Sequence, residues 1–256
     1  MISLNKLIEY ETNFPHSFAS VFDQPYGRLF YNTKNPQSHD SNHAVFLNLD
    51  TDLEQALEDL ILFYRVKSLI PRVYPAYQPQ ERERLIPVLA KRGFEIKYSS
   101  DRLYVQNSPS RIVPVEALKV ERAQTMPDQV SEIIRTDDGG DWNVIVISKL
   151  LESDRFHLLV GWVGGEPVCL GVLHLMDGFA RLDDVLPHKE HRGQGYGRAL
   201  VQAILEYHKR VSPGSGLYLW ASNPTAIRIY NEAGFAALQS GLEPWNAWYA
   251  PVGKGR

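Results

Sequence analysis

The sequence contains little that would mark a secreted, membrane-spanning or metal-clustering protein. Cys169 is its only cysteine, which excludes an internal disulfide framework and is typical of a reducing compartment. No apolar stretch approaches the roughly 20 residues of a transmembrane helix, and the first residues lack the uninterrupted apolar core of a secretion signal. We therefore expect a cytoplasmic protein that makes no stable contact with a membrane.

The sequence also lacks a large excess of charge of one sign. The formal net charge is -3 and no cluster of basic residues is present, so we expect no binding to nucleic acid or to an anionic membrane. With 44% hydrophobic and 22% charged residues in 256, the composition is that of an ordinary globular protein, and the length suits one large domain or two smaller ones.

A glycine-rich turn stands between an apolar strand-like run and an amphipathic helix. It reads HRGQGYGR over residues 191–198, and its glycines lie at alternate positions. Such a turn directs backbone N–H groups toward an anion at the positive end of the helix, and Arg192 and Arg198 add formal charge. The Gly-Lys-Ser/Thr of a Walker A loop is absent, and the spacing differs from the dinucleotide fingerprint G-x-G-x-x-G. An ordinary turn that enters a helix is the alternative.

A second motif follows in the segment 223–235. The strand-like residues 217–220 precede it, Asn223 and Pro224 are typical of a helix start, and Gly234 is typical of a helix end. Together with Arg192-x-x-Gly195-x-Gly197, this segment resembles the GCN5-related N-acetyltransferases (GNAT), and the resemblance extends from about residue 113 to 251.

The resemblance implies an α/β protein with a mixed (α+β) sheet that transfers an acetyl group from acetyl-CoA to an amine by direct attack in a ternary complex. It implies no metal. The resemblance places the pantetheine arm of the cofactor against the strand backbone at Val185, Leu186 and Pro187. The amide side chain on the pantetheine side corresponds to Asn223, and the tyrosine beside the sulfur corresponds to Tyr230. The pyrophosphate loop corresponds to Arg192, Gly193, Gln194, Gly195, Tyr196, Gly197 and Arg198. Pro187 departs from the family pattern, because proline has no N–H to donate to the pantetheine arm.

Two residues are the catalytic candidates. Tyr230 matches the family's tyrosine that protonates the departing thiolate, although ordinary packing would also explain a tyrosine there. Asp183 and Asp184 are adjacent acids in an apolar strand and resemble the acidic pair of polyamine-type acetyltransferases. Because strand residues alternate between faces, we expect only one of them to face the site. The resemblance makes Asp183 the candidate base. The alternative is that the acids pair with Arg181 or a neighbouring cation.

The acceptor is expected to be a small amine or a lysine-bearing peptide. Asp183 and the carboxylates at Asp137, Asp138 and Asp141 would form a negative entrance that attracts cations, and Asp184 is a further candidate for substrate contact. A solvated turn is the alternative for the Asp-rich loop. Cys169 is interpreted as a small core residue, and His188 and His191 are not expected to bind a metal.

The first half repeats the element order of the second without its glycine loop. Asp50, Thr51 and Asp52 stand at the corresponding helix start, where two carboxylates would repel a pyrophosphate. We therefore predict tandem GNAT-like domains, a degenerate one over residues 1–110 and an acetyltransferase domain over residues 111–256, in a monomer or homodimer. The rival functions are a non-catalytic acyl-CoA-binding or scaffold protein and a transferase for a larger acyl group.

Overall fold

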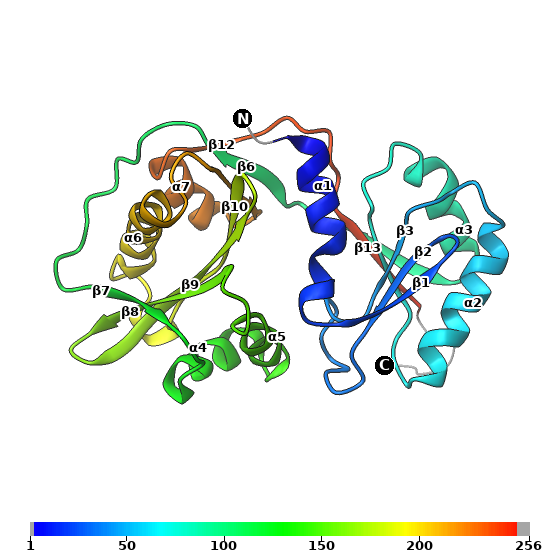
Figure 1. Ribbon diagram of the computed structural model, residues 1–256, viewed down its shortest axis with the longest axis horizontal. Coiled ribbons are helices and arrows are strands. Elements are labelled where there is room, and N and C mark those ends of the chain that lie inside the picture. Colours follow the sequence, from blue (N-terminus) through cyan, green and yellow to red (C-terminus); the bar gives the residue numbers. More distant parts are fainter. Residues whose placement is uncertain (1–2, 250–256) are drawn as a thin grey trace. The chain divides into compact units, whose positions relative to one another are not determined.

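The computed structural model describes residues 3–249, except for the side chain of Asp138. These residues form two compact units (Figure 1). We call Ser3–Ser100 together with residues 241–249 the N-terminal unit, and Asp101–Ser240 the C-terminal unit. The division differs from our predicted boundary at residue 110, and the reason lies in two strands that are described below.

The N-terminal unit contains a six-stranded sheet in the order β1-β2-β3-β4-β13-β5. Strands β3 and β4 run parallel, and helix α2 connects them. Its core gathers apolar residues of α2, among them Leu57 and Leu60, which are fully buried. The elements are α1 (Leu4–Asn13), a 3-10 turn (Phe14–Ser17), β1 (Ser20–Gln24), β2 (Gly27–Tyr31), β3 (Ala44–Phe46), α2 (Leu53–Val66), β4 (Arg72–Tyr74), a π-helical turn (Glu81–Leu85), α3 (Ile86–Lys91), β5 (Phe94–Tyr98) and β13 (Trp245–Tyr249).

The C-terminal unit contains a seven-stranded sheet in the order β12-β6-β11-β10-β9-β8-β7. Only β10 and β11 pair in parallel, while the other neighbours are antiparallel. Helix α6 joins that parallel pair, as in a right-handed β-α-β unit. The elements are β6 (Arg102–Gln106), β7 (Lys119–Ala123), α4 (Asp128–Asp138), α5 (Trp142–Leu150), β8 (Phe156–Val163), β9 (Glu166–Met176), β10 (Phe179–Pro187), a 3-10 turn (Lys189–His191), α6 (Tyr196–Val211), β11 (Gly216–Ala221), α7 (Pro224–Glu232) and β12 (Phe235–Ala237).

Each unit is completed by a strand that is remote in sequence from the rest of it. Strand β6 precedes the predicted boundary at residue 110, yet it pairs with β11 and β12 in the C-terminal sheet. Strand β13 follows helix α7, yet it pairs with β4 and β5 in the N-terminal sheet. A cut at residue 110 therefore removes one strand from each sheet.

Helix α6 is positioned by its apolar face. Leu200, Val201, Ile204 and Leu205 recur at helical spacing and are buried against the sheet. This packing fixes the start of α6, and with it the glycine-rich turn, at the carboxyl end of β10. Among residues 3–249 we find no helix long and apolar enough to cross a membrane.

Candidate active site

Strands β10 and β11 separate beyond a short stretch of pairing. Their parallel ladder covers only three residue pairs and ends at Arg181 and Tyr218. Strand β10 continues to Pro187 and β11 to Ala221. The backbone groups of β10 that face β11 beyond Arg181 are thus not taken up by this ladder, and the predicted pantetheine contacts of Val185, Leu186 and Pro187 fall in this stretch. On its other edge β10 stays paired, with Leu186 opposite Leu170 in β9.

A β-bulge interrupts β10 next to this opening. The register against β9 shifts between Asp183 and Leu186, and Asp184 has a φ of 46°. A non-glycine residue in this left-handed region is held there by its surroundings and is frequent near functional sites. The charges of both Asp183 and Asp184, on the two sides of this register shift, raise the pKa of Tyr230.

Asp183 is an ion-pair partner of Arg181. One guanidinium nitrogen, Nη2, lies 2.6 Å from Oδ2 of Asp183. The other carboxylate oxygen accepts the backbone N–H of Asp184 at 3.2 Å. The Asp183 side chain is 38% exposed and that of Arg181 16%. The alternative pairing with Arg181 is therefore present, and Asp183 is oriented by two donors.

Tyr230 reaches the same place from helix α7. Its side chain is 9% exposed, and its ring packs against Phe235 with centroids 6.0 Å apart. Burial raises the pKa of the Tyr230 phenol well above its usual value, and the carboxylates of Asp183 and Asp184 raise it further. The phenol is therefore protonated at neutral pH and can donate a hydrogen bond or a proton.

The three glycines of the turn are required for different physical reasons. Gly193 and Gly195 have φ values of 81° and 84°, which side chains rarely adopt. Gly197 is needed for space, because a Cβ there would lie 2.8 Å from Cγ of Pro187. Gly195 caps α6, and the first helical hydrogen bond is donated by Ala199 to its carbonyl at 3.0 Å. The N–H groups of the first turn are left for an anion.

Both arginines of the turn are already paired with carboxylates. Arg192 donates to Asp137 at the end of α4, and Arg198 lies 2.5 Å from Glu232 on α7. All four side chains are partly exposed, so the ion pairs are weak and exchangeable. Sequence reasoning missed Glu232, whose only signal is its place two residues after Tyr230.

The Asp-rich loop lies beside the glycine-rich turn and is partly neutralised. Besides the contact of Asp137 with Arg192, Asp141 forms an ion pair of 2.5 Å with Arg135. Lys189 also donates to the carbonyl of Thr136. The side chain of Asp138 lies outside the described residues. The predicted negative entrance is therefore weakened by cations that belong to the same site.

Four other residues singled out from the sequence make local contacts. The Oδ1 atom of Asn223 caps α7 by accepting the N–H groups of Thr225 and Ala226 at 2.9 and 3.3 Å, which leaves its NH₂ group for a ligand. Cys169 is fully buried, and burial raises the pKa of its thiol to about 12, as expected for a core residue. The His188 and His191 rings lie 5.5 Å apart, and within residues 3–249 no group of metal-binding side chains occurs.

Comparison with known proteins identifies this part of the chain. Residues 127–235 match the model of the Acetyltransferase (GNAT) family. They form a GNAT domain. The matched segment includes the glycine-rich turn, the β-bulge and Tyr230. A mycothiol acetyltransferase from Nocardiopsis dassonvillei is 28% identical over 113 residues, which are 39% of this chain and 32% of that protein. The match thus spans about a third of that relative's length.

Solved structures extend the likeness of fold to both units. A GCN5-related N-acetyltransferase from Kribbella flavida superposes with a TM-score of 0.67 at 15% identity, covering 97% of this chain and 95% of the other. A tandem GNAT protein from the clavulanic acid biosynthesis pathway gives 0.58 at 16% identity, with 84% and 76% covered. The predicted mixed α/β fold in two GNAT-like sheets is confirmed.

Proposed function

We propose that this protein is an N-acetyltransferase that uses acetyl-CoA and acts on the amine of a small molecule or peptide. The observation that carries the proposal is the coincidence of three features in one GNAT domain. The β10–β11 ladder ends beside the bulge, the start of α6 presents free amides, and Tyr230 lies near the acidic pair. The first two features form a cradle for the cofactor, and the third supplies a proton donor and a proton acceptor.

The cradle consists of backbone amides from Gly193 to Arg198 and strand backbone from Val185 to Pro187. The pyrophosphate of the co-substrate takes the amides, and Arg192 and Arg198 exchange their carboxylate partners for it. Pro187 offers only a carbonyl on this strand, and its ring packs against Gly197. We propose that one pantetheine hydrogen bond is absent at Pro187, and that the rigid proline ring instead positions the glycine-rich turn by packing against it.

The reaction requires balanced proton transfer. The amine nitrogen attacks the thioester carbonyl, the carbon–sulfur bond breaks, and the thiolate takes a proton from Tyr230. The amine loses a proton to the acidic pair, directly or through water. Arg181 holds Asp183 in one orientation, and the bulge fixes Asp184 beside it. This preorganisation favours a protonated amine as the arriving acceptor.

The N-terminal unit lacks a comparable cradle. Asp52 caps helix α2, and its carboxylate accepts the N–H of Gln55 at 3.1 Å. Glu54 lies in the first turn of the helix. At the end of the parallel pair β3–β4, Nε2 of Gln78 donates to the carbonyl of Phe46 at 2.8 Å. We propose that this unit is a degenerate GNAT-like repeat whose cofactor position is occupied by its own side chains.

Calorimetric titration with coenzyme A tests the cradle. Gly195→Asp places a carboxylate among the amides, so we expect affinity to fall several-fold to hundreds-fold. Gly165→Asp is the matched control, because Gly165 has a similar φ of 89° and, like Gly195, no atom within 4 Å of its ideal Cβ. Equal affinity in both folded variants would reject the site.

Turnover separates the enzyme from a non-catalytic acyl-CoA-binding protein. Acetyl-CoA is incubated with a panel of diamines, monoamines and lysine peptides, and free thiol release is measured. Binding of coenzyme A without acceptor-dependent thiol release would favour the non-catalytic alternative. Comparing acetyl-CoA with longer acyl-CoA species tests the alternative that a larger acyl group is transferred.

A further inference from the structure

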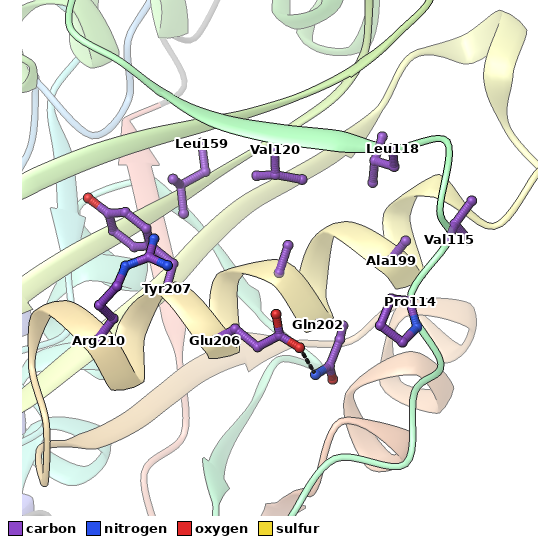
Figure 2. A pocket seen from close by; sticks show the side chains of 11 residues that line it. Pro114, Val115, Leu118, Val120, Leu159, Ala199, Gln202, Glu206, Tyr207 and Arg210 are labelled. Atoms are coloured by element: carbon purple, nitrogen blue, oxygen red, sulfur yellow. Dashed lines mark hydrogen bonds between the residues drawn. The ribbon is translucent and has the colours of Figure 1, made fainter.

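A second pocket lies on helix α6, apart from the residues assigned to acetyl transfer. It has a volume of about 240 Å³. The segment from Pro114 to Val120, Leu159 of β8 and one face of α6 enclose it (Figure 2). None of its lining residues belongs to the glycine-rich turn, the bulge or α7. The volume is below the range of roughly 300–1,000 Å³ for drug-sized ligands, so an occupant would be a small metabolite.

Apolar side chains line part of the pocket. Leu118, Val120 and Leu159 come from the strand side, and Ala199 and Ala203 keep the helix side open. Leu159 is 1% exposed, so it belongs to the core, and a ligand placed here would extend that core. An aliphatic or aromatic group placed there would be removed from water, which favours its binding.

One wall of the pocket is a tyrosine whose orientation is fixed. His157 Nε2 lies 2.8 Å from the carbonyl of Asp154, which only accepts, so Nε2 carries the hydrogen. The Nδ1 atom of His157 therefore accepts the phenol O–H of Tyr207 at 2.9 Å. Burial lowers the pKa of His157, which favours this neutral form. The guanidinium of Arg210 lies over the Tyr207 ring, 5.2 Å from its centroid.

Acceptor and donor groups stand one helical turn apart at the pocket. Gln202 donates its Nε2 to Glu206 at 2.8 Å, which assigns the amide orientation. The Oε1 atom of Gln202 is buried and has no hydrogen-bond partner among the described residues. Because this atom has no surface open to solvent, it lies outside the space that a ligand can enter. Within the described part of the chain, Arg210 forms no ion pair in which its charge is neutralised.

We propose that this pocket binds a free apolar α-amino acid. Its ammonium would donate to the carboxylate of Glu206, and its carboxylate would accept from Arg210. Positions 206 and 210 are i and i+4 on α6, so their side chains are neighbours. The two charged groups of an α-amino acid share one carbon and fit between such neighbours, while the side chain fills the apolar interior.

Binding of L-leucine, measured by calorimetry on the full chain, tests the inference. We expect a Kd of roughly 0.1–1 mM, as for a ligand of this size. Isoamylamine and 4-methylpentanoate each keep one charged group, and both should bind at least 10-fold more weakly. Absence of leucine binding at 10 mM, or equal affinity for either analogue, would overturn the proposal.

Variants locate the bound amino acid. Arg210→Met removes the charge, and Ala203→Phe fills the interior, so each should weaken leucine binding at least 10-fold. Lys209→Met is the control, because Lys209 neighbours Arg210 but does not line the pocket, and it should change affinity less than twofold. Thermal unfolding of each variant verifies folding, and Arg210→Met remains informative if Ala203→Phe is unfolded.

The same titrations separate this site from the proposed active site. Gly195→Asp should retain leucine binding while losing coenzyme A. Loss of leucine binding in Asp183→Asn with retention in Arg210→Met would show that leucine is an acceptor in the active site, and this would refute the second pocket. A wild-type protein that acetylates amines but does not bind leucine would refute only the second pocket.

Discussion

The guanidinium of Arg181 holds the carboxylate of Asp183, with Nη2 2.6 Å from Oδ2. Both residues lie in β10, two positions apart, just before the bulge that carries Asp184. A base that is tied to a cation has a defined orientation but also a stabilised charge. The geometry thus separates two roles for Asp183, proton acceptor and structural ion-pair partner, and kinetics can distinguish them.

Asp183→Asn is expected to lower kcat by about 10²–10⁴ if the carboxylate accepts the amine proton. Arg181→Gln keeps that carboxylate and should lower kcat by only about 10-fold. The double variant completes a cycle, which measures the coupling between the two residues. Equal, small losses in kcat that follow losses in melting temperature would assign Asp183 a structural role only.

Tyr230→Phe removes one hydroxyl while it keeps the packing against Phe235. We expect turnover to fall by roughly 10²–10⁴ with nearly unchanged coenzyme A affinity. The pKa of Tyr230 is raised by burial, so the donating form persists below that raised value and activity should extend to alkaline pH. Tyr104→Phe, at a tyrosine that is 6% exposed in β6, is the control for loss of a buried hydroxyl. A normal rate in Tyr230→Phe would leave packing as its role.

Asp137→Asn is expected to raise coenzyme A affinity a few-fold, because Arg192 would no longer exchange a carboxylate for the pyrophosphate. Asp141→Asn serves as the control, since Asp141 pairs with Arg135 instead. Calorimetry gives the affinity for coenzyme A. The dependence of the acceptor KM on ionic strength shows how strongly the loop carboxylates attract a cationic acceptor. An affinity that falls in Asp137→Asn would mean that this carboxylate organises the turn rather than competing for Arg192.

The features that sequence predicted were those encoded locally. The glycines of the turn, Pro224 and Gly234 each satisfy a backbone requirement within a few residues, and α6 follows from apolar spacing. Those patterns placed the loop at the start of α6 and Tyr230 on α7 without further information. The core position of Cys169 likewise followed from its apolar strand.

The features that sequence did not predict depend on pairing between distant segments. Arg192 and Asp137 are 55 positions apart, and no local pattern joins them. The bulge at Asp184 is a register shift against β9, which alternation along one strand does not reveal. Strands β1 and β2 lie in a polar segment whose residue pattern indicates mainly turns, and the pattern of β6 and β13 does not say which sheet each strand joins.

The exchanged strands predict which fragment folds. A fragment of residues 101–240 retains β6 and all seven strands of its sheet, so it should fold and bind coenzyme A. A fragment of residues 111–256 lacks β6 and carries β13 without its sheet, which exposes two edges and an unpaired strand. Circular dichroism, thermal unfolding and calorimetry compare the two fragments. Cooperative unfolding of the 111–256 fragment with intact coenzyme A binding would show that β6 is dispensable.

Two buried histidines, one in each unit, predict a loss of stability in mild acid. Burial lowers the pKa of His43 and of His174 to about 4, against about 6.5 for a histidine in an unfolded chain. The folded state therefore binds fewer protons than the unfolded state between these values. The contribution to stability is fully present above pH 6.5 and is lost as the pH falls toward 4.

The size of this effect is large enough to measure. A tenfold difference in proton affinity between the folded and unfolded states corresponds to about 1.36 kcal/mol, so each histidine contributes at most about 3 kcal/mol between pH 7 and 4, and roughly 2 kcal/mol by pH 5. His43 also stacks on Tyr74, with centroids 4.1 Å apart, and this contact does not depend on charge in the same way. His174→Gln removes the titrating group, so its free energy of unfolding should be lower than wild type at pH 7.5 and should decline less between pH 7.5 and 5. Urea unfolding at pH 7.5, 6 and 5 measures both slopes, and parallel slopes for wild type and His174→Gln would exclude His174 as a source of the acid sensitivity.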